Sequence, residues 1–322
     1  MSINVLQLAD ELRTEADAYV YLEQMRWGDG HPTCPHCGVL DAHYFLTPKD
    51  GKSRKTRTGS ASERRVWKCK ACRKQFSVLT GTIFHGTKIP VRTWVFVIFD
   101  MCSAKNGISA REIERKYDLT PKTAWFMAHR IREAMKREPI AGLLSGTVIS
   151  DETWIGGKPK NKHGYKPQSK RGPRTDKQPV QTLIHAETGE VRSRVVPNIK
   201  SETLRSHLFE NVDYKNADLH TDEGFGYGPV GRAFRSHETV EHRSGEYVRD
   251  SVSTNKAENY FSQLKRSING TFHHVSTEHL DRYLAEFDFR ATTCKLTDSE
   301  RMAMVLGRTG GRRLMYREPA AA

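Results

Sequence analysis

The sequence predicts an α/β protein in which a sheet-containing domain follows a cysteine-rich module and a pair of helices. Three observations support this fold class. Two Cys-x-x-Cys pairs lie in a loop-rich stretch near the start, an apolar helical pattern follows, and short strands alternate with helices from residue 146 onward. A chain of 322 residues is long enough to bury a substantial core and to form two or three domains.

The composition favours a polyanionic partner. Lys and Arg number 52 against 38 Asp and Glu, which gives a formal net charge of +14. Nucleic acid is the first candidate, and an anionic membrane surface is the second. No apolar run approaches the roughly 20 residues that a spanning helix needs, and the N-terminus lacks the pattern of a secretory signal. We therefore expect a soluble cytosolic protein whose six cysteines are not disulfide-bonded.

The four N-terminal cysteines form a candidate zinc site. Cys34 and Cys37 lie in CPHCG, and Cys69 and Cys72 lie in CKACR. Two intervening residues let both thiolates of a pair reach one ion, and four thiolates complete a tetrahedral structural site. A redox role would need one such pair beside a βαβ pattern, which this segment lacks. Residues 1–85 are therefore predicted to form an N-terminal helix and a zinc ribbon.

Residues 86–140 have the pattern of a helix-turn-helix segment. An apolar helix is followed by a short helix, a tight turn and a longer basic helix, with Thr120 as its N-cap and Pro121 at its first position. The second helix of such a motif can enter a major groove. A plain helical hairpin is the alternative. The basic residues that we expect to be exposed on this helix, and to contact phosphate, are His129, Arg130, Arg132 and Lys136.

Residues 141–295 place acids at the ends of strands. Asp151 follows the apolar run GTVIS, Asp222 follows ADLHT, and a hairpin and a helix lie between them. A later amphipathic helix has Ala257, Tyr260, Phe261 and Leu264 on its apolar face and carries Glu258. This order of strands, helices and acids is the layout of the RNase H-like fold. The alternative for Asp222 is that it simply belongs to a turn that ends the strand, because Asp, Glu and Gly are ordinary turn residues.

Acids on two neighbouring strand ends and one helix can converge to bind two Mg²⁺ ions about 4 Å apart. Lys265 lies two helical turns after Glu258 and can contact the DNA backbone as a point charge. Asn255, one turn before Glu258, is the alternative third ligand, although a carboxylate binds Mg²⁺ better than an amide does. Glu152 and Glu223 are left out of the catalytic set.

Two basic segments flank or interrupt this domain. Residues 157–178 are rich in Lys, Arg, Gly and Pro and lack an apolar pattern. They are either a disordered solvated loop or a segment that orders on DNA phosphates, with Lys170 and Arg171 as the contacts. Residues 296–322 are predicted to be a basic, flexible tail.

The chain resembles DDE-type insertion-sequence transposases, in particular the ISXO-like group with an N-terminal zinc ribbon. The motifs that carry the resemblance span residues 34–290: CPHCG with WKCKACRKQFSVLTGTIF, DETWIGGK, HTDEGFGY, and NKAENYFSQLKRSINGTFHHVSTEHLDRYLAEFDFR. The resemblance implies binding to double-stranded DNA at the element's ends and at the target, with Mg²⁺-dependent cleavage and joining. Mn²⁺ is an alternative ion. It also implies a homo-oligomer on DNA in the bacterial cytosol or nucleoid.

By the same resemblance, the metal ligands are Asp151, Asp222 and Glu258, and Lys265 is the accompanying lysine. Two other functions remain open. One is a DNA-binding regulator whose nuclease-like half is inactive, although all three acids are present. The other is an RNase H-fold nuclease that cleaves without strand transfer.

Overall fold

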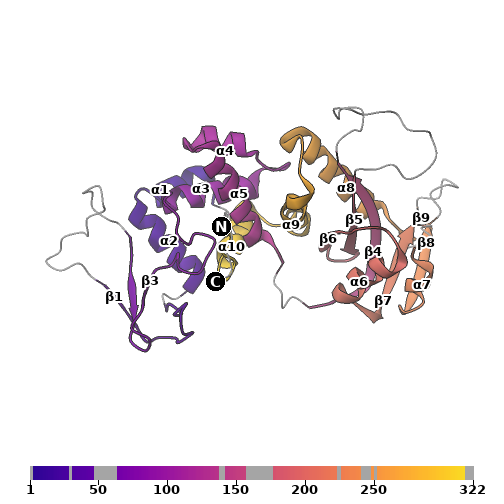
Figure 1. Ribbon diagram of the computed structural model, residues 1–322, viewed down its shortest axis with the longest axis horizontal. Helices are drawn as coiled ribbons and strands as arrows, with labels where there is room; N and C mark the ends of the chain where they lie inside the picture. Colours follow the sequence, from indigo (N-terminus) through magenta and orange to yellow (C-terminus); the bar gives the residue numbers. More distant parts are fainter. Residues whose placement is uncertain are drawn as a thin grey trace, which may run out of the picture. The chain divides into compact units, whose positions relative to one another are not determined.

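The computed structural model describes residues 3–28, 31–46, 64–137, 142–156, 177–222, 226–240, 248–249 and 252–315. The chain divides into two compact units. The first unit contains Met1–Ala104, Ile108–Met135 and Leu296–Ala322, and the second contains Lys105–Gly107 and Lys136–Lys295. Within the described ranges, every helix is too short or too polar to cross a membrane. Figure 1 labels the elements of both units.

The first unit is mainly helical and carries one small sheet. Its helices are α1 (Val5–Glu11), α2 (Glu15–Trp27), α3 (Val91–Ser103), α4 (Ala110–Tyr117), α5 (Pro121–Met135) and α10 (Asp298–Gly307). Strands β1 (His43–Phe45), β2 (Trp67–Cys69) and β3 (Gln75–Phe76) form an antiparallel sheet in that order. Asn4 and Thr14 cap α1 and α2 with capping boxes, so local sequence determines where these two helices begin.

The helix-turn-helix pattern is present as α4 and α5. Helix α4 ends at Tyr117. Asp118 follows as its C-cap with a left-handed φ of 49°, a conformation that Asn and Asp adopt more readily than most residues. Thr120 Oγ1 accepts a hydrogen bond from the Thr123 amide at 3.3 Å, which is the predicted capping contact. Pro121 occupies the first position of α5, where its missing N–H costs nothing.

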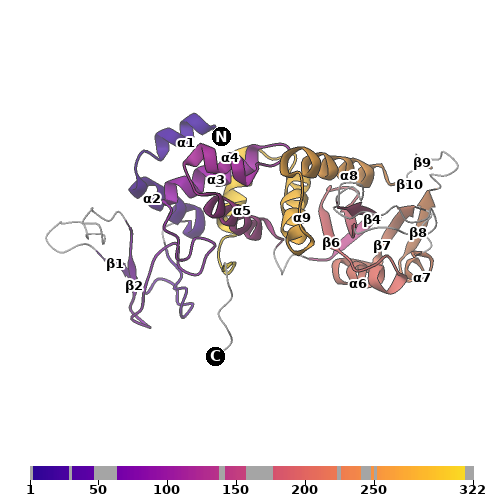
Figure 2. The same cartoon turned by 45° about the horizontal axis from the view of Figure 1, so that its top comes forward.

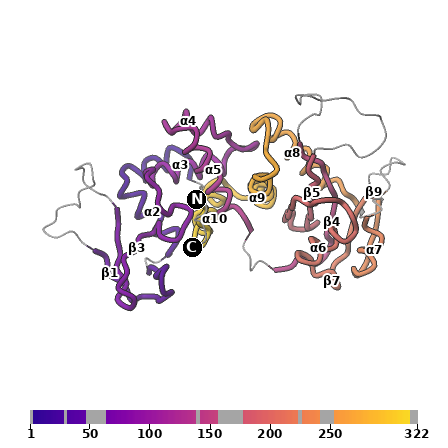
Figure 3. Tube along the Cα trace, viewed as in Figure 1, coloured from indigo at the N-terminus to yellow at the C-terminus, as the bar shows by residue number. Residues whose placement is uncertain are grey.

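The prediction that residues 296–322 form a flexible tail is wrong for the part that forms α10. Thr297 and Glu300 make a reciprocal capping box at its start. Met302, Val305 and Leu306 are fully buried. The helix packs against α2 and α3, and Figure 3 traces this yellow segment beside the indigo and purple ones. Burial of these three side chains holds the segment in the first unit.

The second unit is built on one mixed sheet, ordered β6-β5-β4-β7-β8. The strands are β4 (Leu144–Ile155), β5 (Gln178–His185), β6 (Val191–Val195), β7 (Val212–Asp222) and β8 (Ser236–Val240). Strands β4, β5 and β6 pair antiparallel, whereas β7 is parallel to both β4 and β8. This is the strand order of the RNase H-like fold, and the predicted fold class is confirmed.

Helices cover both faces of that sheet. They are α6 (Ser201–Asn211), the short α7 (Gly228–Gly231), α8 (Asn255–Ser267) and α9 (Thr277–Thr292), with a π-helical turn, η4 (Ile268–Phe272), after α8. The pair β9 (Val248–Arg249) and β10 (Val252–Ser253) lies before α8. Figure 2 shows α8 on one side of the sheet and α6 on the other.

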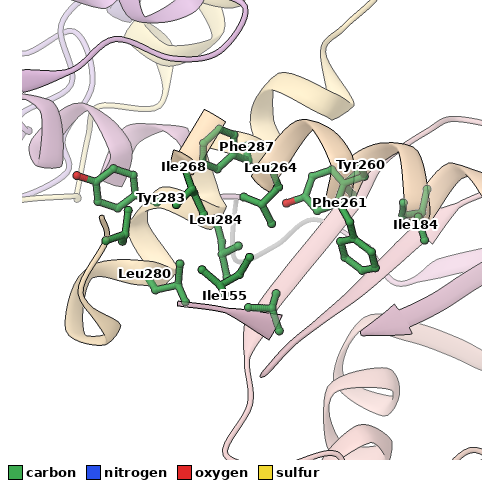
Figure 4. Packing of buried hydrophobic residues seen from close by; sticks show 14 of the residues in the cluster. Ile155, Ile184, Tyr260, Phe261, Leu264, Ile268, Leu280, Tyr283, Leu284 and Phe287 are labelled. Atoms are coloured by element: carbon green, nitrogen blue, oxygen red, sulfur yellow. The ribbon is translucent and has the colours of Figure 1, made fainter. Parts of the chain in front are cut away.

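Strand alternation separates two cores. Ile149 and Ile155 of β4 pack in a cluster with α8 and α9, which Figure 4 shows from close by. Val148, on the opposite face, belongs to a cluster with residues of α6 and β7, including Leu219. The predicted apolar face of α8 is correct, since its residues Ala257, Tyr260, Phe261 and Leu264 are all buried in the first cluster. The sheet thus fixes which side chains face α8.

Candidate active site and metal centre

Asp151 and Asp222 lie at the same level on neighbouring parallel strands. Ile149 of β4 pairs with His220 of β7, and each aspartate follows its strand's paired residue by two positions. Alternation puts Asp151 on the face of Ile149, which packs toward α8. Leu219 packs on the opposite face, so Asp222, three residues later, also faces α8. The sheet therefore brings these two predicted acids together.

Glu258 and Lys265 add their charges from α8. Both side chains are exposed, and they lie in the first and last turns of the helix. Burial raises the pKa of Asp151 to about 7, and the negative charge of Asp222 is the second cause. Glu258 raises the same pKa further, and Lys265 lowers it. The Asp151 carboxyl thus lies within the electrostatic reach of all three predicted partners.

The three carboxylates are more widely spaced than the ligands of a single-ion cage. Among the described residues, only the four cysteines bring three or more candidate ligand atoms within 4.8 Å of one another. Carboxylate oxygens are the hard ligands that Mg²⁺ takes, usually together with several waters. The donor set of Asp151, Asp222 and Glu258 therefore fits Mg²⁺ in chemistry. Asn255, at the start of α8, is exposed and one turn from Glu258.

The side chain of Glu152 lies on the opposite face of the sheet from that of its neighbour Asp151. Alternation turns it to the α6 face, where it accepts a hydrogen bond from the Tyr227 hydroxyl. Tyr227 also bonds Ser150 Oγ at 2.8 Å, and Gln181 Nε2 donates to that oxygen at 3.2 Å. Burial, followed by the charge of Asp151, raises the pKa of Glu152 to about 8. The Glu152 carboxyl thus lies on the face of the sheet opposite to that of Asp151.

Sequence reasoning missed this hydrogen-bonded group beneath the sheet. The alternation of β4 was a usable signal for Glu152, because adjacent strand residues face opposite sides. Tyr227 ends the motif HTDEGFGY, but no local pattern indicates its contact with Ser150, because that contact depends on the tertiary fold. Glu223, which was also left out of the catalytic set, lies outside the described residues.

The cysteine cluster has the dimensions of a zinc site. The four Sγ atoms lie within 4.8 Å of one another, with Cys34 to Cys72 and Cys37 to Cys69 each at 3.7 Å. Tetrahedral zinc with Zn–S bonds near 2.3 Å places its sulfurs about 3.8 Å apart. The two Cys-x-x-Cys pairs pack against Trp27, Trp67 and Phe76. The spacing of the pairs predicted this cluster, and the four thiolates fit a structural Zn²⁺.

The expected exposure of the basic residues on α5 is wrong for three of the four. His129, Arg130 and Arg132 are 0%, 6% and 2% exposed. The Arg130 guanidinium lies 5.3 Å from the Trp94 ring centroid and donates to the His85 carbonyl oxygen at 2.7 Å. Other elements of the unit cover this face of α5, which the helical pattern alone does not reveal.

The remaining predicted phosphate contacts divide into two groups. Lys136, at the end of α5, is partly exposed. Lys170 and Arg171 lie outside the described residues, as does most of the basic insertion 157–178.

Comparison with known families identifies the class. Residues 143–292 match the ISXO2-like transposase domain, and residues 13–75 match the transposase zinc-ribbon domain. The first match contains both aspartates and α8, and the second contains all four cysteines. The chain belongs to the ISXO2-like DDE transposases, and the family that its motifs resemble is confirmed.

Two individual proteins show how far the similarity extends. An uncharacterised protein in the transposable element ISH50 of Halobacterium salinarum is 26% identical over 303 residues, covering 91% of this chain and 96% of that protein. The crystal structure of the catalytic core domain of BIV integrase is 14% identical, with a TM-score of 0.29. That match covers 44% of this chain and 80% of the integrase chain, and a likeness this weak adds nothing to the assignment.

Proposed function

We propose that this transposase binds the ends of its insertion sequence as double-stranded DNA and catalyses metal-dependent strand cleavage and strand transfer. The observation that carries the proposal is the meeting of Asp151 and Asp222 at one level of the sheet, with the charge of Glu258 acting on Asp151. The net charge of +14 supports a nucleic-acid partner. We further propose that the DNA-bound form is a homo-oligomer acting in the bacterial cytosol or nucleoid.

In this proposal Asp151, Asp222 and Glu258 hold two Mg²⁺ ions, with Mn²⁺ as the alternative. When bound, two such ions clamp the attacking and leaving oxygens of an in-line phosphodiester displacement. Asp151, whose pKa is about 7, gives up its proton when it becomes a ligand. Glu258 is preferred to Asn255 because it is charged and a carboxylate is the better Mg²⁺ ligand.

Two further residue groups complete the proposed machinery. The ammonium of Lys265 is exposed on α8, where it can contact a phosphate oxygen next to the carboxylates. The four cysteines hold one structural Zn²⁺, which stabilises the small β1-β2-β3 module. We propose that this module and the α4–α5 pair position the DNA for the second unit.

The test compares Asp151→Asn and Asp222→Asn with the control Glu152→Gln. Strand cleavage and joining are assayed with Mg²⁺ on DNA that carries the element's ends, beside a gel-shift on the same DNA. Both Asn variants should lose cleavage and keep DNA binding, because the amide keeps the shape but removes the charge that holds Mg²⁺. Glu152→Gln should stay active, since that carboxyl faces Tyr227 on the side of the sheet opposite to α8.

Each other outcome points to a different function. Wild-type cleavage by Asp222→Asn would contradict the metal site. Cleavage without joining by the wild-type protein would favour a nuclease. DNA binding with neither reaction would favour a regulator.

A further inference from the structure

Helix α8 must lie at a fixed place and in a fixed rotation if Glu258 is to meet the two aspartates of the sheet. Ala257, Phe261 and Leu264 bury its apolar face in the cluster that also contains residues of the sheet and of α9. Apolar contact is non-directional, so it holds the helix against the sheet without fixing its rotation closely. Hydrogen bonds are directional and can fix that rotation.

Tyr260 makes such a hydrogen bond from the buried face of α8. Its side chain is 7% exposed and packs in the cluster of α8 and α9 side chains that Figure 4 shows. The Tyr260 hydroxyl donates to Asp288 Oδ1 at 2.6 Å. Asp288 lies on α9, so this hydrogen bond joins the two helices.

Asp288 also binds the edge strand of the sheet. Its Oδ2 accepts a hydrogen bond from the Ser193 amide at 2.7 Å, and its Oδ1 accepts one from Ser193 Oγ at 2.7 Å. Ser193 lies in β6, which is an edge strand, and its Oγ is hydrogen-bonded to Thr182 Oγ1 of β5 at 3.0 Å. One carboxylate therefore connects α8 to two strands of the sheet.

Helix α9 is itself fixed along β6 by contacts to the main chain of that strand. Thr292 Oγ1 accepts from the Val191 amide at 3.0 Å, and Asp281 Oδ1 accepts from the Val195 amide at 3.2 Å. The amide that Asp288 binds lies midway between these two. The three contacts satisfy N–H groups that an edge strand otherwise leaves unpaired. They also give α9 one register on the sheet, so the Asp288 carboxylate has a defined position.

The Tyr260 anchor lies close to Glu258 along the helix. Tyr260 follows Glu258 by two residues, which is about 3 Å along the helix axis and about 200° around it. The buried Tyr260 and the exposed Glu258 thus lie on opposite sides of one turn. A rotation of α8 that moved the hydroxyl away from Asp288 would therefore swing Glu258 around the axis. Lys265, seven residues after Glu258, shares its face and would move with it.

Among the described residues, Lys256 and Gln263 also form hydrogen bonds out of α8, and both are more open to solvent than Tyr260. Lys256 donates to the Ala186 carbonyl oxygen, and Gln263 Nε2 donates to Asn106 Oδ1 at 2.5 Å. A buried hydrogen bond is electrostatically stronger than one in contact with water. The Tyr260 contact is buried and ends on a carboxylate, so it is the stronger tie.

We propose that Asp288 is a positioning residue that holds α8 in place through Tyr260 and thereby sets where Glu258 lies. The inference rests on the proposed function in taking Glu258 as a ligand of Mg²⁺ or Mn²⁺. Asp288 is not a ligand in this proposal, since it acts on Glu258 only through the helix. Loss of the anchor should therefore weaken metal binding without removing any ligand.

The test measures the Mn²⁺ affinity of the full zinc-loaded chain at pH 8, from the electron paramagnetic resonance signal of free Mn²⁺. Tyr260→Phe removes the donor but no charge, so weaker attraction to the ion cannot explain a loss of affinity. Asp288→Asn removes the charged acceptor. Asp281→Asn is the matched control, because it makes the same change on the same helix and its hydrogen bond in the described part of the chain goes to β6. Urea unfolding checks that each variant is folded.

Tyr260→Phe and Asp288→Asn should each weaken Mn²⁺ binding about 10-fold, as is usual for residues that orient a metal ligand. Asp281→Asn should bind Mn²⁺ as the wild type does. Glu258→Gln should weaken binding by itself. Adding Tyr260→Phe to Glu258→Gln should cause no further loss, because a positioning residue acts only through the group that it positions, whereas an independent structural role would give additive losses.

Wild-type affinity in Tyr260→Phe and Asp288→Asn, with weakened binding by Glu258→Gln, would overturn the positioning role and leave the metal site standing. An equal loss in Asp281→Asn, or additive losses in the double variant, would have the same consequence. Wild-type affinity in Glu258→Gln, or no Mn²⁺ binding by the wild type, would overturn the proposal together with its metal ligand. If the affinities change as expected but the wild type neither cleaves nor joins DNA, the proposed function fails and the positioning role stands.

Discussion

Replacement of Asp222 by Asn should stabilise the second unit when no Mg²⁺ is present. Burial and the Asp222 charge together hold the pKa of Asp151 at about 7, against an ordinary value of 3.8. The folded state therefore binds this proton more tightly than the unfolded chain does. The stability that results is fully present below pH 3.8 and is lost as the pH rises toward 7.

The size of the effect follows from the Asp151 pKa. At about 1.4 kcal/mol for each pH unit, ionising Asp151 in the folded metal-free protein costs about 4 kcal/mol. Burial is the larger cause and Asp222 the second, so removing the Asp222 charge should recover about 1–2 kcal/mol at pH 8. In the wild type, Mg²⁺ at about 100 times its Kd should instead add about 2.7 kcal/mol.

The assay is urea unfolding at pH 8, with and without Mg²⁺ and with zinc retained, for the wild type and Asp222→Asn. Glu238→Gln is the control, because Glu238 is exposed on the neighbouring strand β8 and its charge is not among those acting on Asp151. The reasoning would be refuted if Asp222→Asn were less stable than the wild type without Mg²⁺. It would also be refuted if Mg²⁺ raised the unfolding free energy of the variant as much as that of the wild type.

Three further predictions concern other parts of the molecule. Cys69→Ser should remove the zinc, which metal analysis of the wild type should find at about one ion per chain. Burial raises the pKa of Asp288 to about 6, so the wild type should lose about 3 kcal/mol of unfolding free energy between pH 4 and pH 7. Asp288→Asn should abolish that loss, which urea unfolding at the two pH values would measure. Tyr227→Phe removes the hydroxyl between Glu152 and Ser150 and should cost about 1–3 kcal/mol in urea unfolding, while Mg²⁺-dependent cleavage persists.

Much of the sheet and its acids could be predicted because the signals are local. The two strands that end in a carboxylate are visible in the sequence as apolar runs followed by Asp151 and by Asp222. The inward face of α8 follows from helical spacing, and the cysteine pairs follow from ligand spacing. What local patterns did not supply is the pairing of Ile149 with His220, which puts both acids at one level.

The incorrect prediction for α5 has a physical cause, which is that the exposure of a side chain depends on what covers its helix. Arg130 and Arg132 have the sequence character of surface residues, but aromatic rings and the preceding loop enclose the first of them. In the C-terminal segment a usable signal was overlooked. Thr297 and Glu300 have the spacing of a capping box, and apolar residues follow at helical intervals.

Asp151 and Glu152 show how one strand points adjacent acids to opposite faces of the sheet. Both have raised pKa values caused first by burial, yet only Asp151 faces α8 and the charges of Glu258 and Lys265. Glu152 faces the Tyr227 hydroxyl on the other side of the sheet, and its pKa is raised by burial and by the charges of Asp151 and Asp222. Since side chains alternate along a strand, the eight-residue pairing of β4 with β5 keeps each acid on its own face. A slip of one residue would exchange them and point Glu152, in place of Asp151, toward α8. The register of β4 is therefore as necessary to the proposed chemistry as the aspartates themselves.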